Sequence, residues 1–126
     1  MKYLCLAYEE ERILNAMSRK EWDALRAETL ACVDDLRERG HMITAEALQG
    51  VETAMSVRVR NGTLSITDGP FAETKETLGG FFMIEAKDLN EALVVASKWP
   101  SARFGCIEVR PIELELREAG RYKDAR

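Results

Sequence analysis

The sequence has one histidine, His41, and three cysteines, Cys5, Cys32 and Cys106, none in a CxxC pair. A single histidine with scattered cysteines lacks the ligand spacing of a zinc or iron site, so no metal is expected. The glycine patterns of dinucleotide and phosphate loops are absent, as is the GxSxG elbow of hydrolases. No cofactor is therefore expected, and a catalytic cysteine would lack the neighbouring base that it needs.

Long apolar runs are also missing. None of the 126 residues belongs to a run approaching the roughly 18 apolar residues of a membrane span, and three glutamates from position 9 interrupt the N-terminal stretch before a signal peptide can form. We expect a cytoplasmic protein without membrane contact, whose cysteines are reduced and buried. A formal net charge of -4 and the lack of a basic run interleaved with aromatics disfavour direct nucleic-acid binding.

What is present suits one soluble globular domain, since 46% of the residues are apolar and 32% are charged. We expect this domain to span residues 1–116. Residues 117–126 alternate basic and acidic side chains, which is typical of a solvated tail.

The first predicted helix begins at a capping box of Ser18 and Glu21 and ends at Gly40, which suits a left-handed C′ position. Its apolar stripe consists of Trp22, Leu25, Thr29, Cys32, Val33 and Leu36. We interpret the stripe as a face packed on the core, because a core stripe is commoner than a ligand-lining one. A second helix is predicted from the Asp88 cap to Pro100. Its expected inner face contains Leu89, Ala92, Leu93, Ala96 and Trp99.

Alternating or apolar runs predict strands over residues 2–8, 42–48, 53–60, 64–66, 81–84 and 107–111. The dipeptide Asn61-Gly62 favours a type I′ hairpin turn. We write the order as βαβββαβ, in which the hairpin over residues 53–66 is counted as one inserted strand: an α+β, ferredoxin-like antiparallel sheet with two helices on one face. The other face of such a sheet needs cover, which a second copy of the chain would provide in a homodimer.

The stretch Asp68–Glu76 reads DGPFAETKE, and this run resembles the signature of the DGPF family of YCII-related proteins, small bacterial proteins of unassigned chemistry. Further resemblance extends from Met1 to about Pro111, through KYLCL at the start, VRVR from Val57, LGGF from Leu78 and IEVRP from Ile107. It implies a dimeric α+β barrel with a cleft near each DGPF loop. Relatives are associated with extracytoplasmic-function sigma factors, which implies a regulatory link.

Two features depart from that family. Residues 45–48 read Ala-Glu-Ala-Leu where the family usually carries a Gly-Glu-Gly-Leu type of segment, so a site here would be narrower. The wider YCII group is proposed to use a His/Asp pair, yet the first predicted helix has no histidine at the corresponding place.

Several candidate site residues lie in the DGPF run. Asp68 is either a turn residue, whose carboxylate accepts backbone amide hydrogens, or a ligand acceptor and general base. Phe71 is interpreted as a hydrophobic plug of the loop, with ring stacking on a ligand as the alternative. Glu73, Thr74 and Lys75 offer an acid, a hydroxyl and an ammonium to a polar ligand, or else are surface residues.

Outside the run, Arg58 and Arg60 either hold a carboxylate or phosphate or form a solvated hairpin edge. Arg110 lies among strand residues, where a charge is expected to be paired, and Glu46 is one partner; these arginines and acids would form the polar end of a cleft. Glu108 and Asp68 are alternative partners for Arg110. His41 follows the first helix, where the helix carbonyls favour its protonated form; it is either a surface cap or a weak general acid or base.

Three functions follow. The first is a dimeric binding protein for a small polar or anionic ligand, with a regulatory role. A second is a cofactor-free enzyme in which Asp68 transfers a proton and Lys75 or an arginine holds an anionic substrate. The third is a structural homodimer module, whose cleft would be filled by its own side chains.

Overall fold

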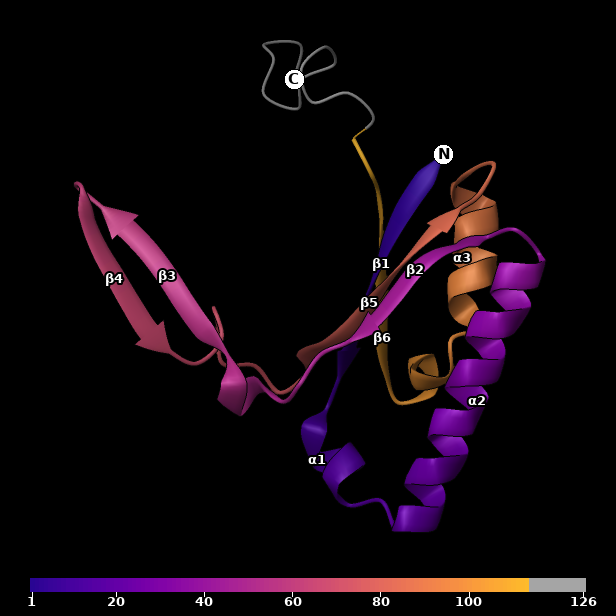
Figure 1. The fold of residues 1–126 in the computed structure, drawn as a ribbon, viewed down its shortest axis with the longest axis horizontal. Coiled ribbons are helices and arrows are strands. Elements are labelled where there is room, and N and C mark those ends of the chain that lie inside the picture. The colour runs from indigo at the N-terminus through magenta and orange to yellow at the C-terminus, as the bar shows by residue number, and fades with distance from the viewer. Residues whose placement is uncertain (114–126) are drawn as a thin grey trace.

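The computed structural model describes residues 1–113 (Figure 1). Its strands are β1 (Lys2–Glu9), β2 (Met42–Ala47), β3 (Met55–Arg60), β4 (Thr63–Asp68), β5 (Thr77–Glu85) and β6 (Gly105–Pro111). The helices are α1 (Glu11–Asn15), α2 (Arg19–Glu38) and α3 (Leu89–Ser97), with 3₁₀ turns η1 (Val51–Thr53) and η2 (Pro100–Arg103). The predicted tail, residues 117–126, lies outside the described residues.

Four strands form an antiparallel sheet in the order β2-β5-β1-β6. Both long helices, α2 and α3, cover one face of it (Figure 1). With the β3–β4 insertion and the short elements α1, η1 and η2 left out, the chain reads β1-α2-β2-β5-α3-β6, which is the split βαββαβ arrangement. The predicted ferredoxin-like α+β fold is therefore confirmed.

The strand count in the predicted order βαβββαβ is wrong, because the insertion contributes two strands. Strands β3 and β4 pair with each other as a separate two-stranded sheet. Asn61 (φ 52°) and Gly62 (φ 78°) close its turn with the positive φ angles expected of a type I′ hairpin. The hairpin lies on the other side of the four-stranded sheet from α2 and α3 (Figure 1).

The core lies between the sheet and the two helices. Tyr3, Cys5 and Ala7 alternate inward along β1, as a strand with one buried face requires. Phe82 of β5 is fully buried and stacks on Trp99, with ring centroids 4.0 Å apart and planes inclined by 16°. Ser101 is the buried polar residue at the edge of this core within the described range.

The helix ends follow local chemistry. Ser18 Oγ accepts the amide hydrogen of Glu21, and Glu21 returns the capping-box bond to Ser18, as predicted. At the other end, the amides of Gly40 and His41 donate to the carbonyls of Arg37 and Leu36 in a Schellman motif, with Gly40 at φ 80°. Asp88 caps α3 by accepting the amide hydrogen of Glu91.

The predicted inner faces of both helices need correction. In α2, Leu36 is buried and Cys32 packs on the core, but Trp22 at the other end is 44% exposed, so the stripe is only partly a core face. Leu89 and Leu93 of α3 are 46% and 48% exposed, and Val95 takes the inward place beside Ala92 and Ala96. Ala92, Val95 and Ala96 have the i, i+3, i+4 spacing of one helix face, which is the face that α3 buries.

The cysteines are free, but they are not all buried as predicted. Cys5 lies in the core, and burial raises the pKa of its thiol to about 12. Burial also raises the pKa of the half-buried Cys32. Cys106 is exposed, because it lies on the edge strand β6 opposite Tyr8, outside the core-facing alternation.

Candidate functional site

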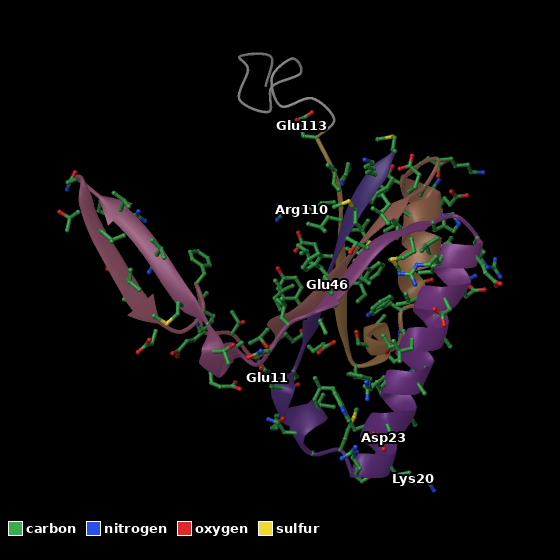
Figure 2. All side chains as sticks on the ribbon, viewed as in Figure 1. Glu11, Lys20, Asp23, Glu46, Arg110 and Glu113 are labelled. Carbon is green, nitrogen blue, oxygen red and sulfur yellow. The ribbon has the colours of Figure 1, made fainter. Side chains whose placement is uncertain are left out.

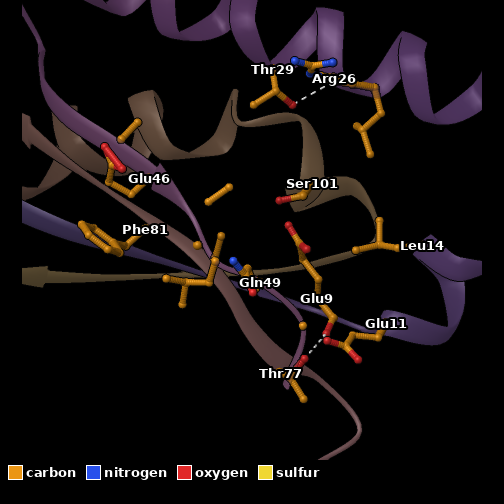
Figure 3. A pocket seen from close by; sticks show the side chains of 18 of the residues that line it. Glu9, Glu11, Leu14, Arg26, Thr29, Glu46, Gln49, Thr77, Phe81 and Ser101 are labelled. Atoms are coloured by element: carbon orange, nitrogen blue, oxygen red, sulfur yellow. Dashed lines mark hydrogen bonds between the residues drawn. The ribbon is translucent and has the colours of Figure 1, made fainter. Parts of the chain in front are cut away.

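A cleft of about 870 Å³ lies between α2 and the end of the sheet where β1 stops and β5 begins (Figure 3). Its apolar wall includes Leu14, Trp22, Leu25, Leu30, Val33, Phe81 and Trp99. The polar side chains that line it are Glu9, Glu11, Asn15, Arg26, Thr29, Glu46, Gln49, Glu52, Thr77 and Ser101. Part of the α2 stripe that the sequence assigned to the core thus lines an open cleft.

Glu9 is the last residue of β1 and keeps the inward phase of Cys5 and Ala7, at the point where the helices no longer close over the strand. Its carboxyl group is therefore half-buried. Desolvation raises the pKa of Glu9 above its usual range, the hydroxyl of Ser101 opposes this rise, and the charge of Glu11 adds to it. Glu9 can therefore take up a proton more readily than an exposed glutamate.

Ser101 faces Glu9 across the cleft (Figure 3). The residue is only 4% exposed, and its Oγ atom has no hydrogen-bond partner within residues 1–113. The hydroxyl lies near enough to influence Glu9, although no hydrogen bond between the two side chains is closed in this conformation. A buried hydroxyl without a partner is costly, and a ligand that hydrogen-bonds to it would remove that cost.

Local backbone structure leaves room for the Glu9 carboxylate. A Cβ atom at Gly79 would lie 2.5 Å from Glu9 Oε2, and one at Gly80 would lie 2.8 Å from the backbone oxygen of Glu46. Thr77 Oγ1 donates to the backbone oxygen of Glu9 at 3.4 Å and joins the ends of β5 and β1. The two glycines therefore serve different purposes: Gly79 leaves space for the Glu9 side chain in the cleft, and Gly80 allows the close approach of β2 to β5.

Two other glutamates of the cleft, Glu11 and Glu46, lie in different surroundings. Glu11 Oε1 accepts the amide hydrogen of Val51 at 3.1 Å, which ties α1 to the segment after β2. Glu46 lies beside Phe81, its register partner on β5, on a side of the cleft away from Glu9 and Ser101 (Figure 3). The four glutamates in the lining outnumber its one arginine, so the cleft is acidic.

Of the residues that the sequence singled out, Glu46 lines this cleft and the others do not. Asp68 is an exposed end residue of β4, paired with Met55. After it, the Gly69 amide donates to the oxygen of Ala54 at 2.8 Å, and Ser56 Oγ donates to the oxygen of Gly69 at 2.8 Å. With Gly69 at φ 105°, the Asp-Gly step is a turn fastened to the base of the hairpin.

The interpretation of Phe71 as a buried plug is wrong, because its side chain is 85% exposed. The Arg58 guanidinium lies 6.0 Å from the centre of its ring, a cation–π distance. Both residues belong to the hairpin and its following loop, which project away from the core.

The remaining loop candidates are exposed. Thr74 Oγ1 donates to the oxygen of Glu76 at 2.5 Å and stabilises a local turn. Lys75 Nζ lies 3.9 Å from Glu10 Oε1, and Glu73 is a surface residue. No binding role for these three residues follows from the cleft geometry.

Arg110 pairs with Glu108, one of its predicted partners, at 2.6 Å (Figure 2 labels Arg110 and Glu46). The ion pair raises the pKa of Arg110 still further. His41 Nδ1 lies 2.8 Å from the backbone oxygen of Glu85 and fastens the start of β2 to the end of β5. The His41 ring lies outside the cleft lining and bonds to a strand carbonyl instead of capping α2.

Sequence reasoning missed Glu9 and Ser101. A signal for Glu9 was present, since a glutamate at the inward phase of a buried strand needs a special environment. Ser101 carried no such signal, because it is buried by the packing of η2 against β6, α2 and β1, of which α2 and β1 are distant in the sequence.

The pKa of Glu9 gives a testable pH dependence. A carboxyl group whose pKa is raised by folding stabilises the fold in its neutral form, and this contribution is lost as the pH rises through the folded-state pKa. Below the unfolded value of about 4.3, Glu9→Gln and the wild type should therefore unfold at similar temperatures. At pH 8 the variant should unfold at the higher temperature. A stability difference that does not change between pH 4 and pH 8, measured by circular dichroism, contradicts the assignment.

Within residues 1–113, no helix is long and apolar enough to cross a membrane. The same residues contain no group of three or more histidine, cysteine, aspartate or glutamate side chains placed to hold a metal ion.

Comparison with known proteins gives a family. The model of the YCII-related domain matches residues 1–115. An uncharacterized protein, R00369, of Rhizobium meliloti (strain 1021) is 34% identical over 116 residues, which cover 90% of this chain and 94% of that protein. The solved structure of 5-chloro-2-hydroxyhydroquinone dehydrochlorinase from Burkholderia phenoliruptrix AC1100, in complex with 2,5-dihydroxybenzoquinone, superposes with a TM-score of 0.54 at 16% identity, covering 90% of this chain and 94% of that one. The chain therefore belongs to the YCII-related family, as its DGPF run indicated.

Proposed function

We propose that this protein binds a small, mainly apolar organic molecule with a hydroxyl or carbonyl group, in the cleft between α2 and the sheet. The observation that carries this proposal is the unpartnered, buried Ser101 hydroxyl opposite the Glu9 carboxyl group. Together they offer a donor and an acceptor at the end of a cleft whose other walls are largely apolar and aromatic.

The lining charges favour a neutral ligand over the anionic one that the sequence suggested. Glu9, Glu11, Glu46 and Glu52 face the cleft with Arg26 as the cation, so an anion would meet net repulsion. Because the cleft is open, the interpretation as a purely structural module, which required a cleft filled by its own side chains, is disfavoured.

The first experiment is a thermal-shift screen of neutral phenols, hydroquinones and quinones. The acidic 2,5-dihydroxybenzoquinone, which is an anion at neutral pH, is included as the charged comparison because the dehydrochlorinase structure contains it. We expect a compound that raises the unfolding temperature of the wild type and of the surface control Glu38→Gln. Ser101→Ala should weaken its affinity about tenfold, as expected for one lost hydrogen bond. The variant itself should fold normally, since it removes an unsatisfied hydroxyl.

Asp68→Asn separates the two candidate sites. The variant should keep the ligand, because Asp68 stands on the hairpin outside the cleft. A ligand that is lost in Asp68→Asn and kept in Ser101→Ala and Glu9→Gln would move the site to the DGPF loop. The absence of any stabilising compound in the panel would overturn the proposed ligand class.

A second candidate function is catalysis in the same cleft. The raised pKa of Glu9 favours it, because a carboxyl group that exchanges its proton nearer neutral pH can serve as a general acid or base. Glu9, and not Asp68, would then transfer the proton. Each compound that binds is to be incubated with the protein and followed by chromatography and mass spectrometry. Turnover that Glu9→Gln abolishes, while binding persists, supports the enzyme; turnover unchanged in Glu9→Gln excludes this role.

We also propose a homodimer formed through the sheet face that α2 and α3 leave open. Leu4 pairs in register with Met83, and both alternate with the buried Tyr3 and Ile84, so they point to the open face. Leu6 shares that face, and the ion pair of Arg110 with Glu108 lies opposite Leu4 and Leu6 along β6. A second copy would cover this apolar surface.

A further inference from the structure

The β3–β4 hairpin has one apolar face that nothing in the described chain covers. Met55, Val57, Val59, Leu64 and Ile66 are between 56% and 64% exposed. The register places Val57 opposite Ile66 and Val59 opposite Leu64, so these side chains share one face. Ser56, Arg58 and Arg60 alternate with them and point to the other face.

Such a hairpin needs a surface to pack on. A two-stranded sheet is marginally stable alone in water, and an aliphatic face of five adjoining side chains is typical of an interaction site. Strands β3 and β4 pair with each other and with no strand of the four-stranded sheet. The Gly69 amide bonded to Ala54 and Ser56 Oγ bonded to Gly69 close the base of the hairpin and extend the β3–β4 pairing.

We propose that the hairpin is an arm that clasps a second copy of this chain, with its apolar face packed on the partner. Its location argues for this occupant: the hairpin projects on the side of the sheet opposite α2 and α3 (Figure 1), which is the side of the open sheet face. A copy seated on that face therefore lies beside the arm. This inference rests on the dimer proposed above and adds a second contact surface to it.

In a twofold-symmetric dimer, the apolar face of each arm can pack against the open sheet face of the other copy. In an isologous pair each copy contributes an arm and an open sheet face with Leu4, Leu6 and Met83, so both apolar surfaces are covered twice. A stable interface buries about 800 Å² per partner, and the arm adds five aliphatic side chains to what the sheet faces supply. The apolar face of the arm therefore needs an aliphatic surface on its partner, and the open sheet face of a second copy provides one.

The test compares the two faces of the arm in the full-length protein. Val57→Lys combined with Ile66→Glu places an ion pair between two cross-strand partners, which keeps the hairpin paired and the net charge unchanged. Ser65→Glu, opposite Arg58 on the other face, is the matched control. Sedimentation equilibrium should show a dimeric wild type, a dimer dissociation constant raised at least tenfold in the double variant, and little change in the control. Far-UV circular dichroism checks that each variant is folded.

A further variant, Leu6→Lys, tests the contribution of the sheet face to the dimer separately from that of the arm. If Leu6→Lys dissociates the dimer and the Val57→Lys/Ile66→Glu protein stays dimeric, the arm inference is wrong while the sheet dimer stands. A monomeric wild type overturns both the sheet dimer and the arm contact. If Ser65→Glu weakens the dimer as much as the double variant does, the contact is not made by the apolar face of the arm. A photo-crosslinking residue at Val59, in a mixture of isotopically light and heavy protein, should form light–heavy crosslinks to β1 or β5. Crosslinks confined to one copy contradict the clasp.

Discussion

Replacing Phe82 with alanine is expected to lower the free energy of unfolding by about 3–5 kcal/mol, the cost of removing a large buried aromatic side chain. Phe82 is fully buried at the centre of the sheet and stacks on Trp99 at 4.0 Å. Its replacement loses the favourable burial of the phenyl ring and also leaves a cavity. Strands β1 and β2 pair with β5 on either side, so the backbone cannot readily close that cavity.

Phe82→Ala should also change the position of Trp99 in the cleft wall, since Trp99 stacks on Phe82 and lines the cleft. We expect a changed near-ultraviolet circular dichroism signal in Phe82→Ala, and a smaller loss of stability in Phe82→Leu. Val94→Ala, at a 58% exposed position of α3, is the control and should change stability by about 0.5 kcal/mol or less. Urea unfolding measures all three. A Phe82→Ala protein as stable as the control would contradict the position of Phe82 in the core.

Gly105→Ala is expected to destabilise the protein by about 3 kcal/mol or more, because a methyl group there overlaps main-chain atoms. A Cβ atom at Gly105 would collide with the backbone oxygen of Tyr8 and lie 3.3 Å from that of Ser101. No rotation of a side chain relieves an overlap with backbone, so β6 would have to separate from β1. The two strands meet there at the pair of Gly105 and Glu9, beside the cleft.

Gly40→Ala provides the comparison. Gly40 has φ 80° and no atom within 4 Å of an added Cβ, so alanine there costs only backbone strain, about 1 kcal/mol. Urea unfolding should rank Gly105→Ala well below Gly40→Ala, and the weakened β1–β6 pairing should appear as faster amide hydrogen exchange on both strands. Equal losses for the two variants would show that β6 accommodates the methyl group.

The elements that the sequence predicted correctly depend on local chemistry. The capping box at Ser18, the stop at Gly40 and the Asn61-Gly62 turn each need only a few neighbouring residues. The first strand, the long helix and the final strand followed from the period of their apolar residues. The expected ferredoxin-like fold and the family rest on these elements and on the DGPF run, and both are confirmed.

The candidate site was harder to predict, because its residues lie far apart in the chain. The DGPF run is conspicuous, yet its Asp-Gly step forms the fastened base of a hairpin, and Phe71 is exposed. Glu9 and Ser101 come together only because β6 and η2 return beside β1, which no local pattern encodes. Trp22 is a further example: helical spacing identified the stripe to which it belongs, but only the tertiary packing of α2 shows that Trp22 lines a cleft.

The sequence by itself determined the class of fold, the family and the local devices that start and stop each element, since these depend on residues close together in the chain. Only the tertiary structure decided that the acidic cleft lies under α2, that Glu9 loses water there, and that the β3–β4 hairpin projects on the open side of the sheet. The physical reason is that burial and desolvation are properties of packed surfaces, and those surfaces form only when distant segments meet.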